Sequence, residues 1–101
     1  MSYFLLFLAG ALLCNAIPHL AAGLRGEPFP TPFATPRGVG KSPPLVNFLW
    51  GTANAFAGVA LAAWRWPSVD CRIGAGMAAS GWLAIGVYLA LHFGAVRAKN
   101  G

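Results

Sequence analysis

Seven polar or aromatic side chains stand inside stretches of the chain that are otherwise apolar, and they are the residues whose chemistry a site could use. They are His19, His92, Asn47, Asn15, Asn54, Trp50 and Tyr88. Imidazole exchanges protons near neutral pH and binds metals, and amides both donate and accept hydrogen bonds. Because burying such groups without partners is costly, they indicate candidate ligand-binding positions.

The elements that must position these residues are three apolar stretches, at about residues 3–24, 45–66 and 73–96. None carries a charged residue before its last positions. An uncharged apolar run of about 18 residues or more is long enough to cross a hydrocarbon core of about 30 Å. The sequence therefore predicts an all-α integral membrane bundle of three transmembrane helices, with a Pro-rich first loop. We expect residues 1–101 to form a single transmembrane domain.

Composition supports a membrane protein. Hydrophobic residues make up 57% of the chain and charged residues only 9%, against about 25% charged residues in an ordinary soluble domain. The net charge of +5 comes from residues that flank the apolar runs, which is typical of membrane topology and not of a nucleic-acid groove. The first run lacks a basic start and is long for a signal peptide, so we expect it to remain as a span.

The basic residues also predict an orientation. They are Arg25, Arg37 and Lys41 in the first loop, Arg97 and Lys99 in the tail, and Arg65 and Arg72 around the second loop. With three spans, the first loop and the tail share one side of the membrane. The positive-inside rule places that side in the cytoplasm and the N-terminus outside. The frequent Ala, Gly and Arg fit a bacterial inner membrane.

Depth along the spans groups the polar residues. His19, Asn47 and His92 all lie one to two helical turns inside the predicted cytoplasmic boundary, so we expect them to form one layer. Below them, a second layer would consist of Asn15, Trp50, Asn54 and Tyr88. The two layers together predict a polar funnel that opens toward the Pro-rich loop.

Small residues and one proline shape the spans. Close helix packing in a bilayer requires small side chains, and the candidates for it are Gly51, Gly58, Gly81 and Ala84. Pro18 predicts a bend beside His19, because it removes the hydrogen bond to the carbonyl of Cys14. Asn15, one turn earlier, could supply that carbonyl with a partner.

The first loop, residues 25–44, contains six prolines, which exclude a helix. Its residues Phe29 and Phe33 are too apolar to stay in water, so we expect the segment to lie at the interface or across the cytoplasmic mouth of the bundle. A stiff spacer anchored by these rings is favoured over a binding lid. The run from Arg37 to Ser42 lacks Walker spacing, so its cations are better explained by contact with anionic lipid headgroups.

Conventional catalysis and metal binding have little support. Glu27 and Asp70 are the only carboxylates and lie on opposite predicted sides, and no third ligand completes a zinc site. Cys14 and Cys71 fall at different depths, so we expect two free thiols. No cofactor is predicted, and haem ligated by His19 and His92 is a minor alternative because three short spans leave little room for it.

Part of the chain resembles a group of small uncharacterised bacterial inner-membrane proteins. The segments that carry the resemblance are residues 15–19 (Asn-Ala-Ile-Pro-His), the loop segment 28–33 and residues 47–54. It covers residues 15–58 and implies a multi-span membrane protein. The resemblance brings no activity with it.

We expect the protein to be a binding or accessory subunit in a homo-oligomer or a larger membrane complex rather than an enzyme. Its His/Asn layer would hold a lipid, a quinone-like ligand or a partner helix. The polar residues could instead only bond helices together. An oligomeric transporter or channel for a small solute is the other alternative, since three helices alone do not enclose a pathway.

Overall fold

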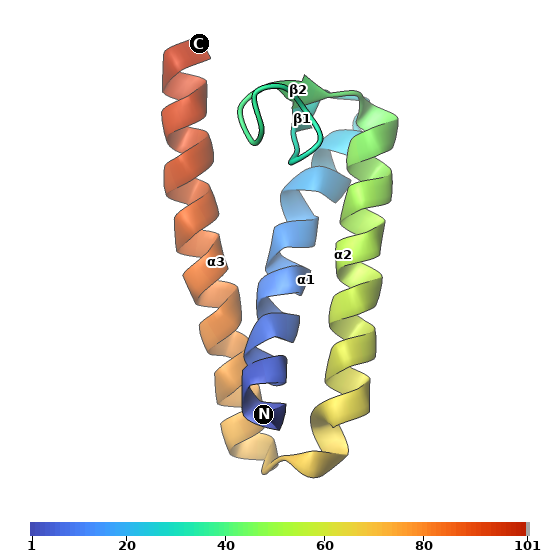
Figure 1. Cartoon of the computed structure of the whole chain (residues 1–101), viewed down its shortest axis with the longest axis vertical. Helices are drawn as coiled ribbons and strands as arrows, with labels where there is room; N and C mark the ends of the chain where they lie inside the picture. The colour runs from blue at the N-terminus through green and yellow to red at the C-terminus, as the bar shows by residue number, and fades with distance from the viewer. Residues whose placement is uncertain (101) are drawn as a thin grey trace.

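Each apolar stretch forms one long helix in the computed structural model, which describes residues 1–100 (Figure 1). The elements are α1 (Ser2–Leu24), β1 (Phe29–Pro30), β2 (Lys41–Ser42), α2 (Pro44–Arg65), the 3-10 helix η1 (Trp66–Ser68) and α3 (Cys71–Asn100). All three α-helices are long and apolar enough to cross a membrane. The predicted fold class, an all-α bundle of three transmembrane helices, is confirmed.

The helix ends follow from local sequence. After α1, Gly26 adopts a positive φ of 72°, which glycine reaches without strain. The Glu27 and Gly26 amides then donate to the carbonyls of Ala22 and Gly23, at 2.9 and 3.1 Å, and this closes the helix as a Schellman motif. At the start of α3, Asp70 Oδ1 accepts from the amides of Arg72 and Ile73, as an N-cap does. Cys71 is therefore the first residue of α3, which begins two residues before the predicted third span.

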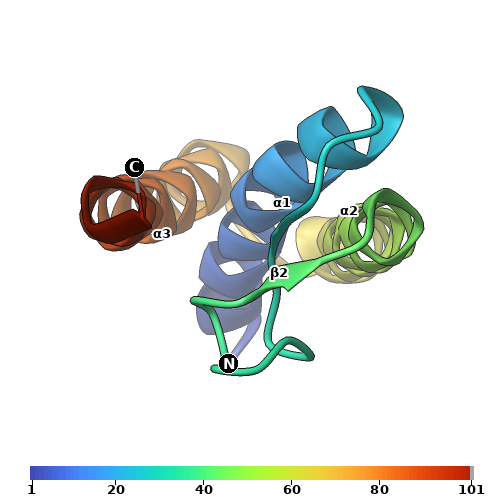
Figure 2. The same ribbon diagram turned by 90° about the horizontal axis from the view of Figure 1, so that it is seen from above.

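The helix α1 lies between the other two. It packs against both α2 and α3, whereas α2 and α3 make few contacts with each other. Viewed from above, α2 and α3 stand on opposite sides of α1 (Figure 2). Away from the second loop, α3 diverges from α1 (Figure 1). The bundle is therefore closed at the second loop and wider at the first.

Glycines allow the close contacts with α1. A Cβ placed on Gly51 would lie 2.8 Å from Cγ of Leu20, and one on Gly58 would lie 2.8 Å from Cγ of Leu13. A Cβ on Gly81 would collide with the carbonyl of Phe7. These three glycines all face α1 within the same chain, which is the close approach that small residues permit.

Ala84 does not share this face, contrary to the prediction. It is exposed, whereas Ile85, Gly86 and Leu89 are half-buried. Ile85 lies four residues after Gly81, so the face of α3 that meets α1 continues at position 85 and not at position 84. Ile85 and Leu89 line the space that opens where α3 moves away from α1 (Figure 1).

The first loop folds back over the bundle. Its two short strands pair antiparallel, with Phe29 opposite Ser42 and Pro30 opposite Lys41. The ring of Phe29 packs edge-on against Phe93 with centroids 4.7 Å apart. Phe33 is 64% exposed but its ring meets Trp50 edge-on at 5.0 Å. The favoured spacer interpretation is therefore wrong for Phe29: the loop forms a cap across the mouth of the bundle, because apolar contacts are available there.

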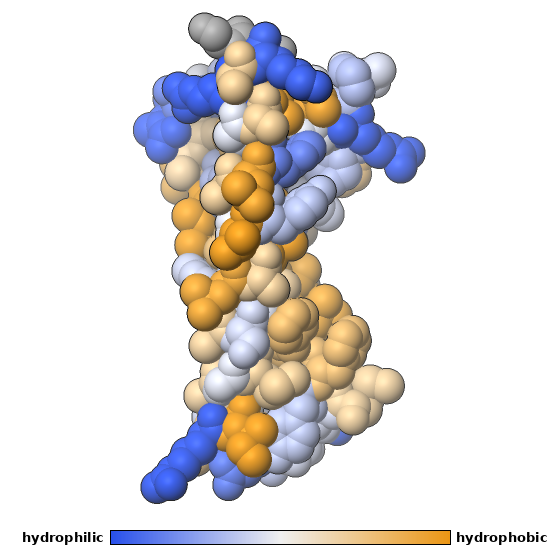
Figure 3. Space-filling view, turned by 90° about the vertical axis from the view of Figure 1, so that its left-hand side faces the viewer, coloured by the Kyte–Doolittle hydropathy of each residue, from blue (hydrophilic) through white to orange (hydrophobic). Residues whose placement is uncertain are grey.

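Charged residues gather at the two ends of the molecule, and the middle is mostly apolar (Figure 3). The N-terminus and the second loop share one end, and the first loop and the C-terminal end of α3 share the other (Figure 1). At the first of these ends, Arg65 Nη2 donates to Ser2 Oγ at 2.6 Å and the Asp70 amide donates to the Tyr3 hydroxyl at 3.0 Å. These bonds tie both of the other helices to the start of α1.

Candidate functional site

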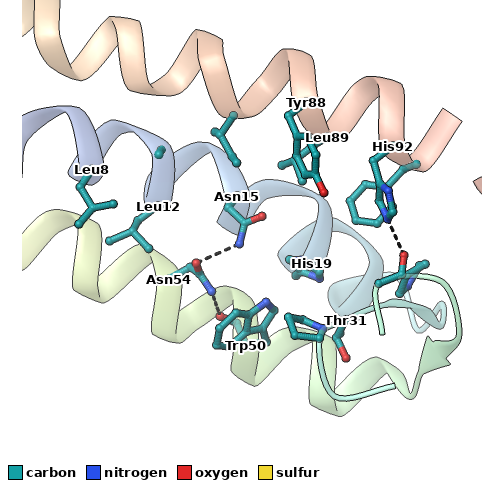
Figure 4. Close-up of a pocket in the computed structure, with 16 residues that line it drawn as sticks. Leu8, Leu12, Asn15, His19, Thr31, Trp50, Asn54, Tyr88, Leu89 and His92 are labelled. Atoms are coloured by element: carbon teal, nitrogen blue, oxygen red, sulfur yellow. Dashed lines mark hydrogen bonds between the residues drawn. The ribbon is translucent and has the colours of Figure 1, made fainter. Parts of the chain in front are cut away.

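A cavity of about 360 Å³ lies beneath the cap and is lined by all three helices and the first loop (Figure 4). This volume falls in the range of small-molecule sites, about 300–1,000 Å³. Six of the seven predicted ligand-binding residues line it: His19, His92, Asn15, Asn54, Trp50 and Tyr88. The tertiary structure thus brings together residues from three helices that are far apart in the chain.

Asn47, the seventh residue, does not line the cavity. It is fully buried, with 0% exposure. Its Nδ2 donates to the backbone carbonyls of Phe29, Ser42 and Pro43, at 3.0, 3.1 and 3.2 Å. Asn47 therefore attaches the cap to the start of α2, and its side chain has no group left for a ligand.

The bonds of Asn47 also define the protonation of His19, which is 2% exposed. Three carbonyls surround Nδ2 of Asn47, so the amide oxygen Oδ1 must be the atom that lies 2.8 Å from Nδ1 of His19. An amide oxygen only accepts. In the neutral ring Nδ1 carries the proton, and Nε2 is a hydrogen-bond acceptor with no partner among residues 1–99.

His92 is oriented by the cap. Its Nε2 lies 2.7 Å from the carbonyl oxygen of Gly38, and because a carbonyl only accepts, His92 donates from Nε2. The ring stacks on Tyr88, with centroids 5.8 Å apart and an angle of 6° between the planes. This bond connects the cap to α3, just as Asn47 connects it to α2.

A short chain of amide bonds crosses from α1 to α2. Asn15 Nδ2 donates to Asn54 Oδ1 at 3.0 Å, and Asn54 Nδ2 donates to the Trp50 carbonyl at 2.8 Å (Figure 4). Asn15 therefore bonds across the bundle, and the suggested partnership with the carbonyl of Cys14 is not formed. The helix α1 continues without interruption through Pro18. The bend at Pro18 stays a prediction.

Trp50 supplies an unpaired donor. Its indole Nε1 is buried and has no hydrogen-bond partner. Among the described residues that are not exposed, it is the only side-chain nitrogen or oxygen that lacks a partner and is itself fully shielded from solvent. Figure 4 shows the nitrogen on the edge of the ring that faces the cavity. An unmet buried donor costs about 1–3 kcal/mol, and such groups in folded proteins call for an explanation.

Some lining residues carried no usable signal in the sequence. Thr31 is 1% exposed and its Oγ1 lies 2.6 Å from Ser42 Oγ, which holds the two sides of the cap together. Gly38 contributes its backbone carbonyl, and a backbone group of this kind cannot be predicted from the residue type. The Phe93 ring packs against both histidines, with its centroid 6.5 Å from that of His19 and 5.1 Å from that of His92. In the sequence, the only signal that Phe93 belongs to the site is its position next to His92.

The free polar groups define what the cavity can hold. Trp50 Nε1 is a donor and His19 Nε2 an acceptor, and much of the remaining wall is apolar. The apolar wall includes Leu8, Leu12, Ile85 and Leu89. Within the described range, no three His, Cys, Asp or Glu side chains come together as they would around a metal ion. Cys14 and Cys71 are free thiols, as predicted. The arrangement suits a neutral, largely apolar molecule with a few hydrogen-bonding atoms.

Fold and cavity together define a class: a three-helix protein of membrane-spanning type with a cavity beneath a loop cap. Comparison of the chain with models of protein families, with curated proteins and with solved structures gives no match.

Proposed function

We propose that the protein is a membrane binding or accessory subunit that holds one small, neutral, quinone-like molecule in the cavity beneath its cap. The observation that carries this proposal is the buried, unpartnered Nε1 of Trp50 in the cavity wall. A ligand carbonyl would accept from that N–H and remove the cost of leaving it unpaired.

His19 supports the same ligand class. Its Nδ1 is held by Asn47, so Nε2 accepts while the ring is neutral. A ligand that carries a hydroxyl as well as a carbonyl would satisfy both His19 and Trp50. Quinones and their reduced forms have this chemistry, and their apolar rings fit the leucine-rich wall. Charged solutes would find no opposite charge among the described residues that line the cavity.

Access from the bilayer is supported by the arrangement of the helices. Because α2 and α3 make few contacts with each other, the bundle lacks a helix–helix seam on that side. Tyr88 lines the cavity and is also 58% exposed, so it stands at the rim. The cap closes the end that faces water, through the bonds of Asn47 and His92. A lipid-soluble ligand would therefore arrive laterally.

The alternatives are less well supported. A transporter would need small-residue faces for oligomer packing or for a water path, yet Gly51, Gly58 and Gly81 already pack on α1. Haem between His19 and His92 would have to displace Phe93, which packs against both rings. We retain a homo-oligomer or a larger membrane complex as the setting, and a bacterial inner membrane with the N-terminus outside as the location.

The first experiment is native mass spectrometry of the protein extracted gently from its own membrane. We expect a defined added mass on each subunit. Purified protein is then loaded with a short-chain benzoquinone, and the fraction that carries one molecule is measured for wild type, Trp50→Phe and Trp82→Phe. Trp50→Phe keeps an aromatic ring but removes the donor, and it should lower the apparent affinity about tenfold, as expected for a lost buried hydrogen bond.

Trp82→Phe is the matched control, because Trp82 is exposed and outside the cavity. It should bind like wild type. Equal binding by wild type and both variants would show that the indole donor does not hold the quinone. The absence of any single bound mass in the native extract would contradict the proposal as a whole.

A further inference from the structure

A second groove lies outside the cap, between the first loop and the last turns of α3. Its volume is about 670 Å³. Its lining includes Phe29, Lys41, Phe93, Val96 and Arg97. The groove sits at the end of the helices where the apolar spans give way to charged residues (Figure 3). In a membrane, this level corresponds to the headgroup region.

Cations dominate the polar part of the groove. Arg25, Lys41 and Arg97 line it together with a single carboxylate, Glu27. Arg25 and Glu27 form an ion pair at 2.6 Å, and both are exposed. Within residues 1–99, Lys41 and Arg97 form neither an ion pair nor a side-chain hydrogen bond. They come from β2 and from the last turns of α3, so the fold holds two free cations around one groove.

The floor of the groove is apolar. Phe29 and Phe93 pack edge-on at 4.7 Å, and Val96 is 9% exposed beside them. A soluble phosphate would gain nothing from this floor. A lipid would cover it with the first part of an acyl chain while its phosphate lay among the cations. Attraction of an anionic headgroup by surface Lys and Arg is a general feature of membrane interfaces.

We infer that this groove is a binding site for one anionic phospholipid, with Lys41 and Arg97 on the phosphate and the Phe29–Phe93 pair under the acyl chain. The site is distinct from the cavity under the cap, although Pro30 and Phe93 contribute to the wall of both. A lipid bound here would bridge the cap and α3.

The test compares two double variants of the full chain in lipid nanodiscs. Lys41→Gln with Arg97→Gln removes the two free groove cations. Arg37→Gln with Lys99→Gln is the matched control, since it removes the same charge from the same end of the molecule but from residues outside the groove. The fraction of protein that retains one phosphatidylglycerol is measured by native mass spectrometry, with phosphatidylcholine at the same concentration as the neutral reference.

Wild type should retain phosphatidylglycerol in preference to phosphatidylcholine. The groove variant should lose about thirtyfold in apparent affinity, the effect of two basic residues on an anionic lipid, and the control, whose residues lie outside the groove, should lose less than about twofold. Equal losses in both variants would show a diffuse charge effect and overturn the site. Competition by soluble glycerophosphoglycerol at the lipid's own concentration would overturn the role of the apolar floor. Trp50→Phe should retain the lipid, which separates this site from the cavity.

Discussion

At the residue scale, Asn47 shows how one buried amide can organise a site without touching its ligand. Its Nδ2 bonds three backbone carbonyls, from β1, from β2 and from the residue before α2. The same bonds force its oxygen toward His19. A single side chain therefore sets both the position of the cap and the tautomer of His19, and the cavity depends on both.

Replacing Asn47 by Ala should destabilise the protein by about 2 kcal/mol, because the Nδ1 proton of His19 and the carbonyls of Phe29 and Ser42 would lose their side-chain partner. Unfolding in mixed micelles measures this change. Ser80→Ala is a suitable control, since the exposed Ser80 hydroxyl bonds only the Gly76 carbonyl of its own helix. A loss no larger than that of Ser80→Ala would contradict the anchoring role of Asn47.

At the element scale, the angle between α1 and α3 determines where the cavity can exist. Near the second loop the two helices approach closely enough that a Cβ on Gly81 would collide with the Phe7 carbonyl. Toward the first loop α3 diverges (Figure 1), and Ile85, Leu89 and Phe93 appear on its inner side as cavity-lining residues. The two helices are thus in close contact near the second loop, and the angle between them leaves space for the cavity near the first loop.

Gly81→Leu should push α3 away from α1 and lower stability by about 1–3 kcal/mol, the usual cost of overpacking. Gly76→Leu adds the same side chain in the same helix at a position where nothing lies within 4 Å, and it should be close to neutral. The two variants are compared by unfolding in the same micelles. If they were equally stable, the close α1–α3 contact would not be part of the native packing.

At the scale of the whole molecule, the distribution of charge and the three spans predict one topology. The end that carries the cap holds Arg25, Arg37, Lys41, Arg97 and Lys99, and the opposite end holds Arg65 and Arg72. The positive-inside rule predicts that the cap end faces the cytoplasm. In that topology the proposed phospholipid groove would lie in the inner leaflet, and Cys71 would be exposed to the outside.

A thiol-labelling experiment tests this topology. In a Cys14→Ala background, the exposed Cys71 should react with a membrane-impermeant maleimide on intact spheroplasts. With Cys71→Ala as well, Ala98→Cys should react only after the membrane is permeabilised. Labelling of Ala98→Cys alone on intact spheroplasts would reverse the orientation, and the groove would then face the outer leaflet.

The sequence alone determined the helices, the polar ends and most of the polar side chains that line the cavity. Helix length and hydropathy are sums over neighbouring residues, so they can be obtained without knowing any long-range contact. The same is true of depth, since each residue rises about 1.5 Å along its helix. For this reason His19, His92, Asn15, Asn54, Trp50 and Tyr88 could be predicted as one group, and they do line one cavity.

Only the tertiary structure decided how each residue is used. Asn47 shares its depth with the two histidines but bonds the cap, because the loop carbonyls come within reach of its Nδ2. Ile85 and not Ala84 faces inward because of how α3 is rotated about its own axis where it packs on α1. The first loop forms a cap because the ring of Phe29 packs against Phe93 and His19 beneath it. Each of these outcomes depends on where a segment distant in the sequence lies. Hydropathy and helix length are summed over neighbouring residues, so they do not reveal which distant segments contact each other.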